Sequence, residues 1–226
     1  MSGELLQLST FTLACAAGAT LLAMPFGVAL AWWLARGTFR GKALVETLVT
    51  LPLVMPPVAT GLILLQLLAP RGPIGSLLAR VGIDVVFTWR AVVVAMALMG
   101  MPLLVRTARA GFEHVDARYE HIAWTLGATP FRAFLTVTLP LATRSLVAGA
   151  VLAFARALGE FGATIMVAGS IPGRTRTLST AIYMYAETGM DREAMVLLAV
   201  SAALSFSAVL YSNRLLETWS STSISR

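Results

Sequence analysis

The sequence predicts an all-α polytopic membrane protein. Apolar residues make up 58% of its 226 positions and charged residues only 12%, whereas soluble domains carry about 45–50% and about 25% respectively. Five apolar windows can cross a bilayer as helices, which requires about 20 residues each. These windows are Phe11–Ala35, Leu48–Ala69, Ala91–Val105 (extended by residues 87–89), Leu139–Leu158 and Ala194–Leu215. We expect them to form a single transmembrane domain over residues 1–226.

The composition also excludes some classes of function. Lysine and arginine total 17 against 11 acidic residues, but they are scattered through the turns and form no basic stripe, which argues against nucleic-acid binding. Cys15 has no second cysteine to pair with. It is therefore predicted to be a small buried hydrophobe.

The basic residues predict the topology. The first of them follow the first span, so the positive-inside rule places the N-terminus outside. With an odd number of spans the C-terminus is then cytoplasmic. Ten of the 17 Lys and Arg fall on the proposed inner side: Arg36, Arg40, Lys42, Arg106, Arg109, Arg118, Arg132, Arg144, Arg214 and Arg226. Residues 113–140 are thereby assigned to the cytoplasm.

The second span contains Pro52, Pro56 and Pro57, followed by Gly61. The Pro56-Pro57 pair removes two backbone donors and disfavours helical angles in the residue before it. Two interpretations remain open: a broken helix beside a substrate path, or an ordinary proline kink. Residues 70–90 are expected to form an external connection with a short interfacial helix.

Residues 113–140 contain two predicted helices around a glycine. Asp116 suits the N-cap of a helix over Ala117–Leu126, and Gly127 can end it in the left-handed conformation. The apolar face of this helix would hold Tyr119, Ile122, Ala123 and Leu126, and the solvated face Arg118, Glu120, His121 and Thr125.

The second of these helices would be capped by Thr129, with Pro130 in its first position, and would re-enter the membrane at Leu139-Pro140. Two interpretations of the whole stretch remain open. It either binds a partner outside the lipid or packs only on its own protein.

After the fourth span, Arg156 and Glu160 are four residues apart and would share a helix face as an ion pair. Glycines at 159, 162 and 169 argue against a straight helix here. The pair is either a gate or packing joint near a pathway, or a salt-paired helix end at the outer interface. The candidate pathway residues are Pro56, Pro57, Arg156, Glu160, Phe161, Gly162 and Thr164.

No catalytic, cofactor or metal site is predicted. The turn Gly37–Ala43 has three residues between its glycines, where a phosphate-binding loop needs four, and ends on alanine instead of Ser or Thr. His114 and His121 lack the i, i+4 spacing of a helical metal site.

The spacing Ala123, three residues, Gly127, nine residues, Val137, one residue, Leu139-Pro140 resembles the cytoplasmic EAA loop of ABC importer transmembrane subunits. That pattern reads Glu-Ala-Ala, three residues, Gly, nine residues, Ile, one residue, Leu-Pro. His121 and Ile122 stand where it has Glu and Ala, and the acid lies one place earlier, at Glu120. The segments 39–44, 51–58, 157–164 and 171–177 resemble molybdate permeases; sulfate and thiosulfate permeases share the Gly-Glu-Phe-Gly part.

The resemblance implies a homodimer in a bacterial inner membrane, with two cytoplasmic ATPase subunits and a periplasmic binding protein that delivers molybdate or tungstate. ATP would bind to the ATPase subunits, and this subunit would hold no cofactor and no tight anion site. The ATPase-coupling residues would be Glu120, Ile122, Ala123, Leu126, Gly127, Pro130, Leu139 and Pro140. An ATPase-independent channel or secondary transporter is the alternative. It would need an intramembrane acid, for which Glu160, already paired with Arg156, is the candidate.

Overall fold

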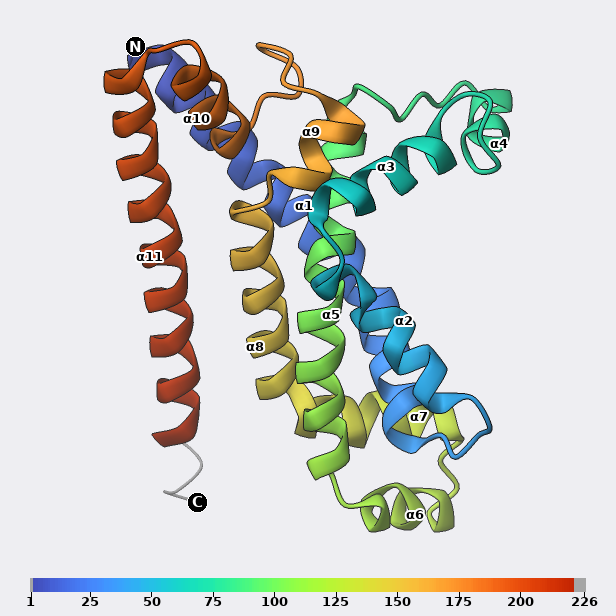
Figure 1. Ribbon diagram of the computed structural model, residues 1–226. Helices are drawn as coiled ribbons and strands as arrows, with labels where there is room; N and C mark the ends of the chain where they lie inside the picture. The colour runs from blue at the N-terminus through green and yellow to red at the C-terminus, as the bar shows by residue number, and fades with distance from the viewer. Residues whose placement is uncertain (1, 222–226) are drawn as a thin grey trace.

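The computed structural model describes residues 2–221, which form helices, turns and loops without a strand in that range (Figure 1). The helices are, in order, α1 (Ser2–Arg36), α2 (Lys42–Val54), α3 (Pro57–Leu68), α4 (Gly75–Arg80), α5 (Trp89–His114), α6 (Ala117–Thr125), α7 (Pro130–Ala133), the π-helix η1 (Phe134–Thr138), α8 (Leu139–Leu158), α9 (Gly162–Ala168), α10 (Leu178–Glu187) and α11 (Asp191–Ser221).

Four helical stretches of the described chain are long and apolar enough to cross a membrane: residues 3–36, 89–114, 130–158 and 191–210. The pair α2 and α3 makes a fifth span if its two halves are counted together, although they are bent by 112°. The predicted all-α membrane fold is confirmed. The second window, Leu48–Ala69, is two helices rather than one, and the break lies at the predicted prolines.

Helix α5 packs against both α1 and α8 at the centre of the bundle (Figure 1). Its apolar window is 67% buried, against 11% for α11. Small residues of α1, including Ala16, Ala19 and Ala23, pack against Val92 and Ala95 of α5. Small side chains let helix backbones approach closely where lipid provides no hydrophobic driving force.

The break between α2 and α3 follows from its two prolines. Met55, which precedes Pro56, is extended with φ −68° and ψ 146°, as expected for a residue before proline. Pro57 begins α3, where its missing N–H costs no hydrogen bond. Because the chain turns by 112°, this is a break and not a kink.

A second break separates α8 from α9, and it lies against the first. Helix α8 ends at Leu158, and α9 begins at Gly162 after a short non-helical link. Helix α9 packs on α3, with Gly61 facing Ala163. The glycines at 159 and 162 therefore mark the end of a straight helix, as the sequence indicated.

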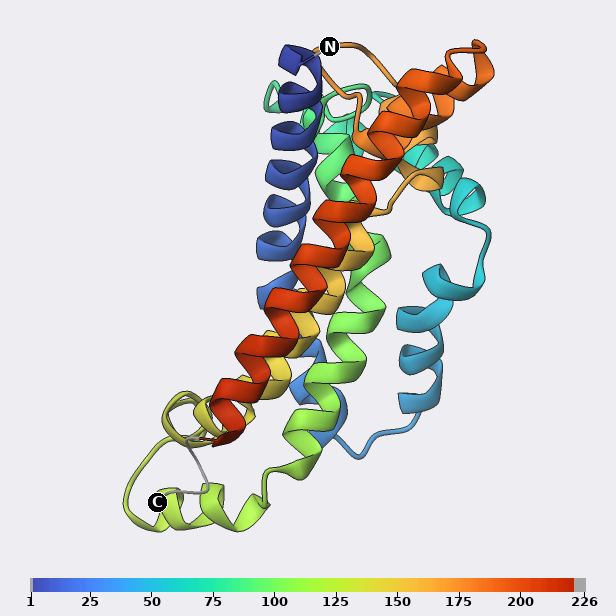
Figure 2. The same ribbon diagram turned by 90° about the vertical axis from the view of Figure 1, so that its left-hand side faces the viewer.

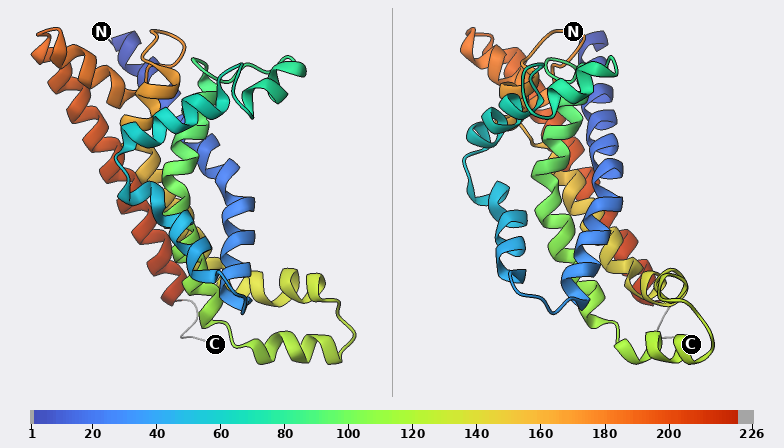
Figure 3. Two further views of the ribbon diagram at one scale, coloured as in Figure 1. Left: turned by 45° about the vertical axis from the view of Figure 1, so that its right-hand side comes forward. Right: turned by 90° about the vertical axis from the view of Figure 1, so that its right-hand side faces the viewer.

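The molecule has two ends that carry different elements (Figure 3). We call them the α4 end, with the start of α1, α4 and α10, and the α6 end, with α6, α7 and the last turns of α11. Residues 70–90, where the sequence predicted a short helix, contain α4; its location at a membrane interface stays a prediction. Arg226, counted on the inner side, lies outside the described residues.

The contact between α3 and α9 provides a first test. A methyl group at Gly61 would lie 2.8 Å from the Ala163 Cα and 2.8 Å from its carbonyl oxygen. Gly61→Ala should therefore push the helices apart and lower the free energy of unfolding by about 1–3 kcal/mol. Thermal unfolding followed by tryptophan fluorescence measures this.

Gly18→Ala is the matched control, since a methyl group there would meet only Val93 Cγ2 at 3.8 Å. This helical position should be unchanged or stabilised by up to about 1 kcal/mol. Equal unfolding midpoints for the two variants would contradict the close packing of α3 on α9.

Candidate functional site

The segment between α5 and α8 has the local structure that its sequence predicts. The Asp116 carboxylate accepts a hydrogen bond from the Arg118 N–H at 2.9 Å and caps α6. Gly127 has φ +86°, and its N–H donates to the Trp124 carbonyl at 2.9 Å. The Thr129 hydroxyl accepts from the Arg132 N–H at 3.3 Å and caps α7, with Pro130 in its first position.

Glu120 ties this segment to the rest of the molecule. Its Oε1 lies 3.1 Å from Nη2 of Arg36, the last residue of α1, and accepts the Thr138 hydroxyl of η1 at 2.6 Å. The same Arg36 nitrogen donates to the Val115 carbonyl at 2.9 Å. One carboxylate thus joins α1, α6 and η1.

The predicted solvated position of Glu120 is wrong, because Glu120 is the one residue of α6 that is buried, with 8% of its surface exposed. Helical spacing shows which residues share a face, but it does not reveal a partner 84 positions away. Arg36 and Thr138 were not predicted as site residues for the same reason.

With Glu120 turned inward, the apolar side chains of this segment are exposed. We call Tyr119, Ile122, Trp124, Leu126 and Phe131 the α6 patch; Leu126 is 82% exposed and Phe131 71%. Trp124 was not predicted because it falls outside the i, i+3, i+4, i+7 series. Several large exposed apolar side chains on one short segment are typical of an interaction surface.

Aromatic contacts hold the base of the segment. The Phe134 ring lies 5.2 Å from that of Trp32 and 6.1 Å from that of Phe112, measured between centroids. In η1 the Leu139 N–H bonds to the Phe134 carbonyl, five residues back. Such a π-type turn alters the register of side chains, and here Thr138 is fully buried opposite Glu120. Leu139 and Pro140 then begin α8.

The two helix breaks form a second region of interest. Glu160 is 1% exposed, pairs with Arg156 Nη1 at 2.8 Å and accepts the Ala163 N–H at 2.7 Å. It therefore joins the end of α8 to the start of α9. Gly162 lies against Pro57, because a methyl group there would be 2.6 Å from the proline Cβ.

The joint between α3 and α9 contains two buried hydroxyls without partners among the described residues, those of Thr60 and Thr164. Each is next in sequence to a residue of the close Gly61–Ala163 contact. Buried polar groups are nearly always hydrogen-bonded. Separation of α3 from α9 would let water or a polar solute satisfy both hydroxyls.

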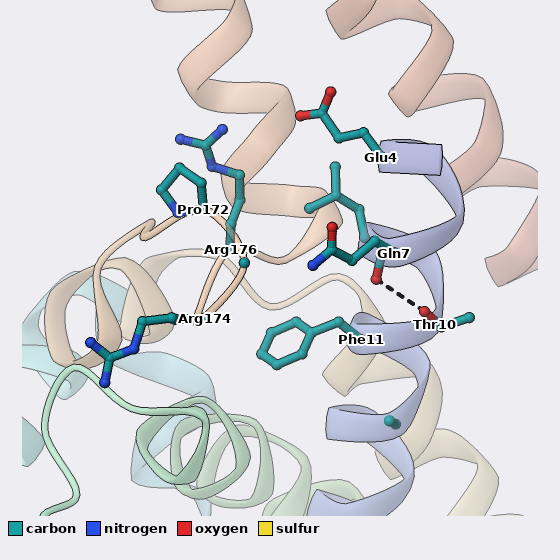
Figure 4. Close-up of a pocket in the computed structure, with 10 residues that line it drawn as sticks. Glu4, Gln7, Thr10, Phe11, Pro172, Arg174 and Arg176 are labelled. Carbon is teal, nitrogen blue, oxygen red and sulfur yellow. Dashed lines mark hydrogen bonds between the residues drawn. The ribbon is translucent and has the colours of Figure 1, made fainter. Parts of the chain in front are cut away.

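A third region lies at the α4 end, where the first turns of α1 face the loop before α10 (Figure 4). The pocket between them has a volume of about 590 Å3, and its polar lining includes Gln7, Arg174 and Arg176. Arg176 Nε donates to the Ser170 hydroxyl at 3.2 Å, while Arg174 is exposed. The first turns of α1 form the opposing wall of this pocket, which the sequence did not predict.

Glu4 stands at the edge of the same pocket and accepts a hydrogen bond from the Tyr185 hydroxyl of α10. This bond raises the pKa of Tyr185, since the neutral phenol is the donor and a phenolate would face a carboxylate. Glu4 thus joins α1 to α10, and the two arginines supply the positive charge of the pocket.

Residues 23–219 match the family described as binding-protein-dependent transport system inner membrane component. The chain belongs to this family. Among its relatives, the molybdenum transport system permease protein ModB of Escherichia coli is 47% identical over 196 residues, which are 86% of each chain. The sulfate transport system permease protein CysT of Escherichia coli is 40% identical over 186 residues, covering 80% of this chain and 67% of CysT.

The fold of this family member is also that of a solved transporter. A bacterial ABC transporter involved in the import of the acidic polysaccharide alginate superposes with a TM-score of 0.73 over 96% of this chain and 80% of that chain, at 18% identity. At that identity the likeness concerns the fold alone. The relatives are transport permeases, so the inner-membrane component family is one of membrane transport subunits.

The Glu120 contacts generate a second prediction. Glu120→Gln keeps an acceptor for Thr138 but leaves the Arg36 charge uncompensated. Because the Arg36 and Glu120 side chains are only 22% and 10% exposed, water cannot fully replace the lost pairing, and we expect a loss of about 1–3 kcal/mol in the free energy of unfolding and faster tryptic cleavage of residues 115–138.

Glu113→Gln serves as the control. Its side chain is 45% exposed, and its partner Arg109 keeps Glu46 at 2.7 Å, so the change should stay below about 0.5 kcal/mol. Equal cleavage rates in the two variants would show that Glu120 does not anchor the segment.

Proposed function

We propose that this chain is the transmembrane subunit of an ATP-driven importer that moves a tetrahedral oxyanion, molybdate or tungstate, across the inner membrane. The observation that carries the proposal is its 47% identity with a molybdenum permease over 86% of both chains. In this account the chain is one permease domain over residues 1–226, in which residues 113–140 form the coupling loop.

The α6 end would face the cytoplasm and receive the ATPase, which binds and hydrolyses ATP. The α6 patch supports this assignment, since it is apolar, exposed and supported from behind by Glu120 and Arg36. Ile122, Ala123, Leu126 and Gly127 would enter a groove of the ATPase. ATP binding and hydrolysis would move the ATPase and, with it, α6. Pro130, Leu139 and Pro140 would transmit this movement to α8, and Glu120 would transmit it to α1.

A second copy of this chain would complete the path. Helix α2 supports a homodimer because it has no buried residue, although it is strongly apolar. Leu44, Leu48, Leu51, Leu53 and Val54 of α2 are all exposed. The α4 end would face the periplasm and bind the oxyanion-binding protein, next to the pocket that contains Arg174 and Arg176.

The joint between α3 and α9 would lie on the path of the ion. Pro56, Pro57, Phe161, Gly162 and Thr164 would form its moving surface, and the Arg156–Glu160 pair its hinge. Glu160 neutralises Arg156 at 2.8 Å. A divalent anion would therefore meet hydroxyls and backbone N–H groups rather than a charged cage that would retain it in low dielectric.

Two other functions make different demands. Sulfate or thiosulfate transport is the first alternative, and the 40% identity with the sulfate permease CysT gives weaker support for sulfate than the 47% identity with ModB gives for molybdate. An ATPase-independent channel or secondary transporter would need a titratable acid in a span. Glu160 is poorly suited to that role because an arginine and a backbone N–H already bind its carboxylate.

The transported ion can be identified by measuring uptake with the reconstituted complex of permease, ATPase and binding protein. Radiolabelled molybdate should enter proteoliposomes only with ATP. The tungstate concentration that halves this uptake should be more than about tenfold lower than the sulfate concentration that does so. Competition by sulfate as strong as that by tungstate would overturn the molybdate assignment, and uptake without ATPase would overturn the importer.

Gly127 tests the coupling loop. Its φ of +86° is unfavourable for side chains, although a Cβ added there would have no neighbouring atom within 4 Å. Gly127→Val should therefore distort the turn without a clash and reduce co-purification of the ATPase and ATP-dependent uptake about tenfold. Gly127→Asn, which tolerates the left-handed region, should retain most of both. Full coupling in Gly127→Val would refute the proposed role of the loop.

A further inference from the structure

A cavity lies between α2 and α5, near the α6 end. Helix α2 runs to one side of α5 (Figures 2 and 3), and the space between them measures about 610 Å3. Its walls carry apolar residues of both helices. The polar side chains that line it are Glu46, Thr47 and Thr50 of α2 and Arg106 and Arg109 of α5.

The two arginines of this cavity differ in their partners. Arg109 is held by two carboxylates, with Nη1 at 2.7 Å from Glu46 and Nε at 2.7 Å from Glu113. Arg106 is exposed, and within residues 2–221 no hydrogen bond or ion pair of its guanidinium was found. The positive charge that remains available in the cavity is therefore that of Arg106.

Two hydroxyl groups face the same space from α2. The Thr47 hydroxyl donates to the Ala43 carbonyl at 2.8 Å, and the Thr50 hydroxyl donates to the Glu46 carbonyl at 2.9 Å. Both carbonyls already belong to the helix, so these side-chain bonds are dispensable. Each hydroxyl can rotate to donate to an anion in the cavity.

We propose that this cavity is a transient binding site for a tetrahedral oxyanion at the α6 end of the path, with Arg106 as the attracting charge and Thr47 and Thr50 as hydrogen-bond donors. The identity of the ion rests on the proposed function. Two carboxylates overcompensate Arg109, so Arg106, Arg109, Glu46 and Glu113 together carry no net charge. Arg106 therefore attracts the anion at short range without trapping it.

A phospholipid phosphate offers the same chemistry, so the test must separate the two sources. The chain has one native cysteine, Cys15, which is buried. Thr47→Cys, or Thr50→Cys if the first variant does not fold, therefore places one reactive thiol in the cavity, with the unsubstituted chain as the blank. Methanethiosulfonates with a sulfonate or a trimethylammonium group then report the local potential through the ratio of their reaction rates.

The matched variants are Arg106→Gln, Arg106→Lys and Arg40→Gln. Arg40 is an exposed arginine in the turn before α2, outside the cavity. Arg106→Gln should lower the ratio of anionic to cationic rates about 3–10-fold, while Arg106→Lys and Arg40→Gln should leave it within about twofold. Equal ratios in Arg106→Gln and Arg40→Gln would overturn the proposal.

Protection by the ion identifies the occupant. Millimolar tungstate should slow labelling of the thiol at least threefold in the reconstituted complex, and this protection should disappear in Arg106→Gln. If tungstate does not protect the thiol, and the labelling rate depends on the lipid headgroup instead, then Arg106 binds a lipid phosphate and the proposed site is refuted. The rate ratio is measured without transport, so it stands even if the uptake experiment fails.

Discussion

The ion pair between Arg36 and Glu120 is the contact on which the arrangement of the α6 end depends. A carboxylate with 8% exposure is tolerable only when its charge and lone pairs are matched, and here an arginine and a threonine hydroxyl match them. Their partnership brings together the end of α1, helix α6 and the residues of η1 that precede α8. It also determines which side of α6 is hidden, and so leaves the apolar side chains of the α6 patch to face outward.

A related constraint acts at the two helix breaks. Inside a membrane, backbone groups freed by a break must find partners within the protein. Pro56 and Pro57 have no N–H groups, so fewer backbone donors need a partner at the first break. At the second break, Glu160 accepts a hydrogen bond from the Ala163 N–H. The breaks therefore stabilise each other by packing together, with Gly61 and Gly162 permitting the contact. The hydroxyls of Thr60 and Thr164, which have no partner among residues 2–221, place polar groups at the contact between α3 and α9.

Among the described residues, the arginines with carboxylate partners lie at other places than the arginines that line the cavities. Arg36, Arg109 and Arg156 have carboxylate partners, and they lie at joints between helices. Arg106 and Arg174 are exposed and line cavities near the α6 end and the α4 end respectively. A transport protein for an anion benefits from this division. Neutralised charges stabilise the fold without holding the substrate, and under the proposed function the available charges near the two ends of the molecule would favour its entry and exit.

The sequence alone determined the fold class, the location of most apolar helices, the caps of α6 and α7, and the end of the straight helix at Gly159, because these depend on composition and on local backbone preferences. It located the interruption at Pro56-Pro57 but left a kink and a break both open, and the 112° bend of the structure decided for the break. Its spacing also predicted the Arg156–Glu160 pair, since i, i+4 positions meet within one helix. Only the tertiary structure decided that Glu120 faces inward, that α9 packs on α3, and that Arg106 opens into a cavity while Arg109 is neutralised. These outcomes depend on partners from distant parts of the chain, such as Arg36 for Glu120 and Glu46 for Arg109, and helical periodicity contains no information about which helix will lie opposite.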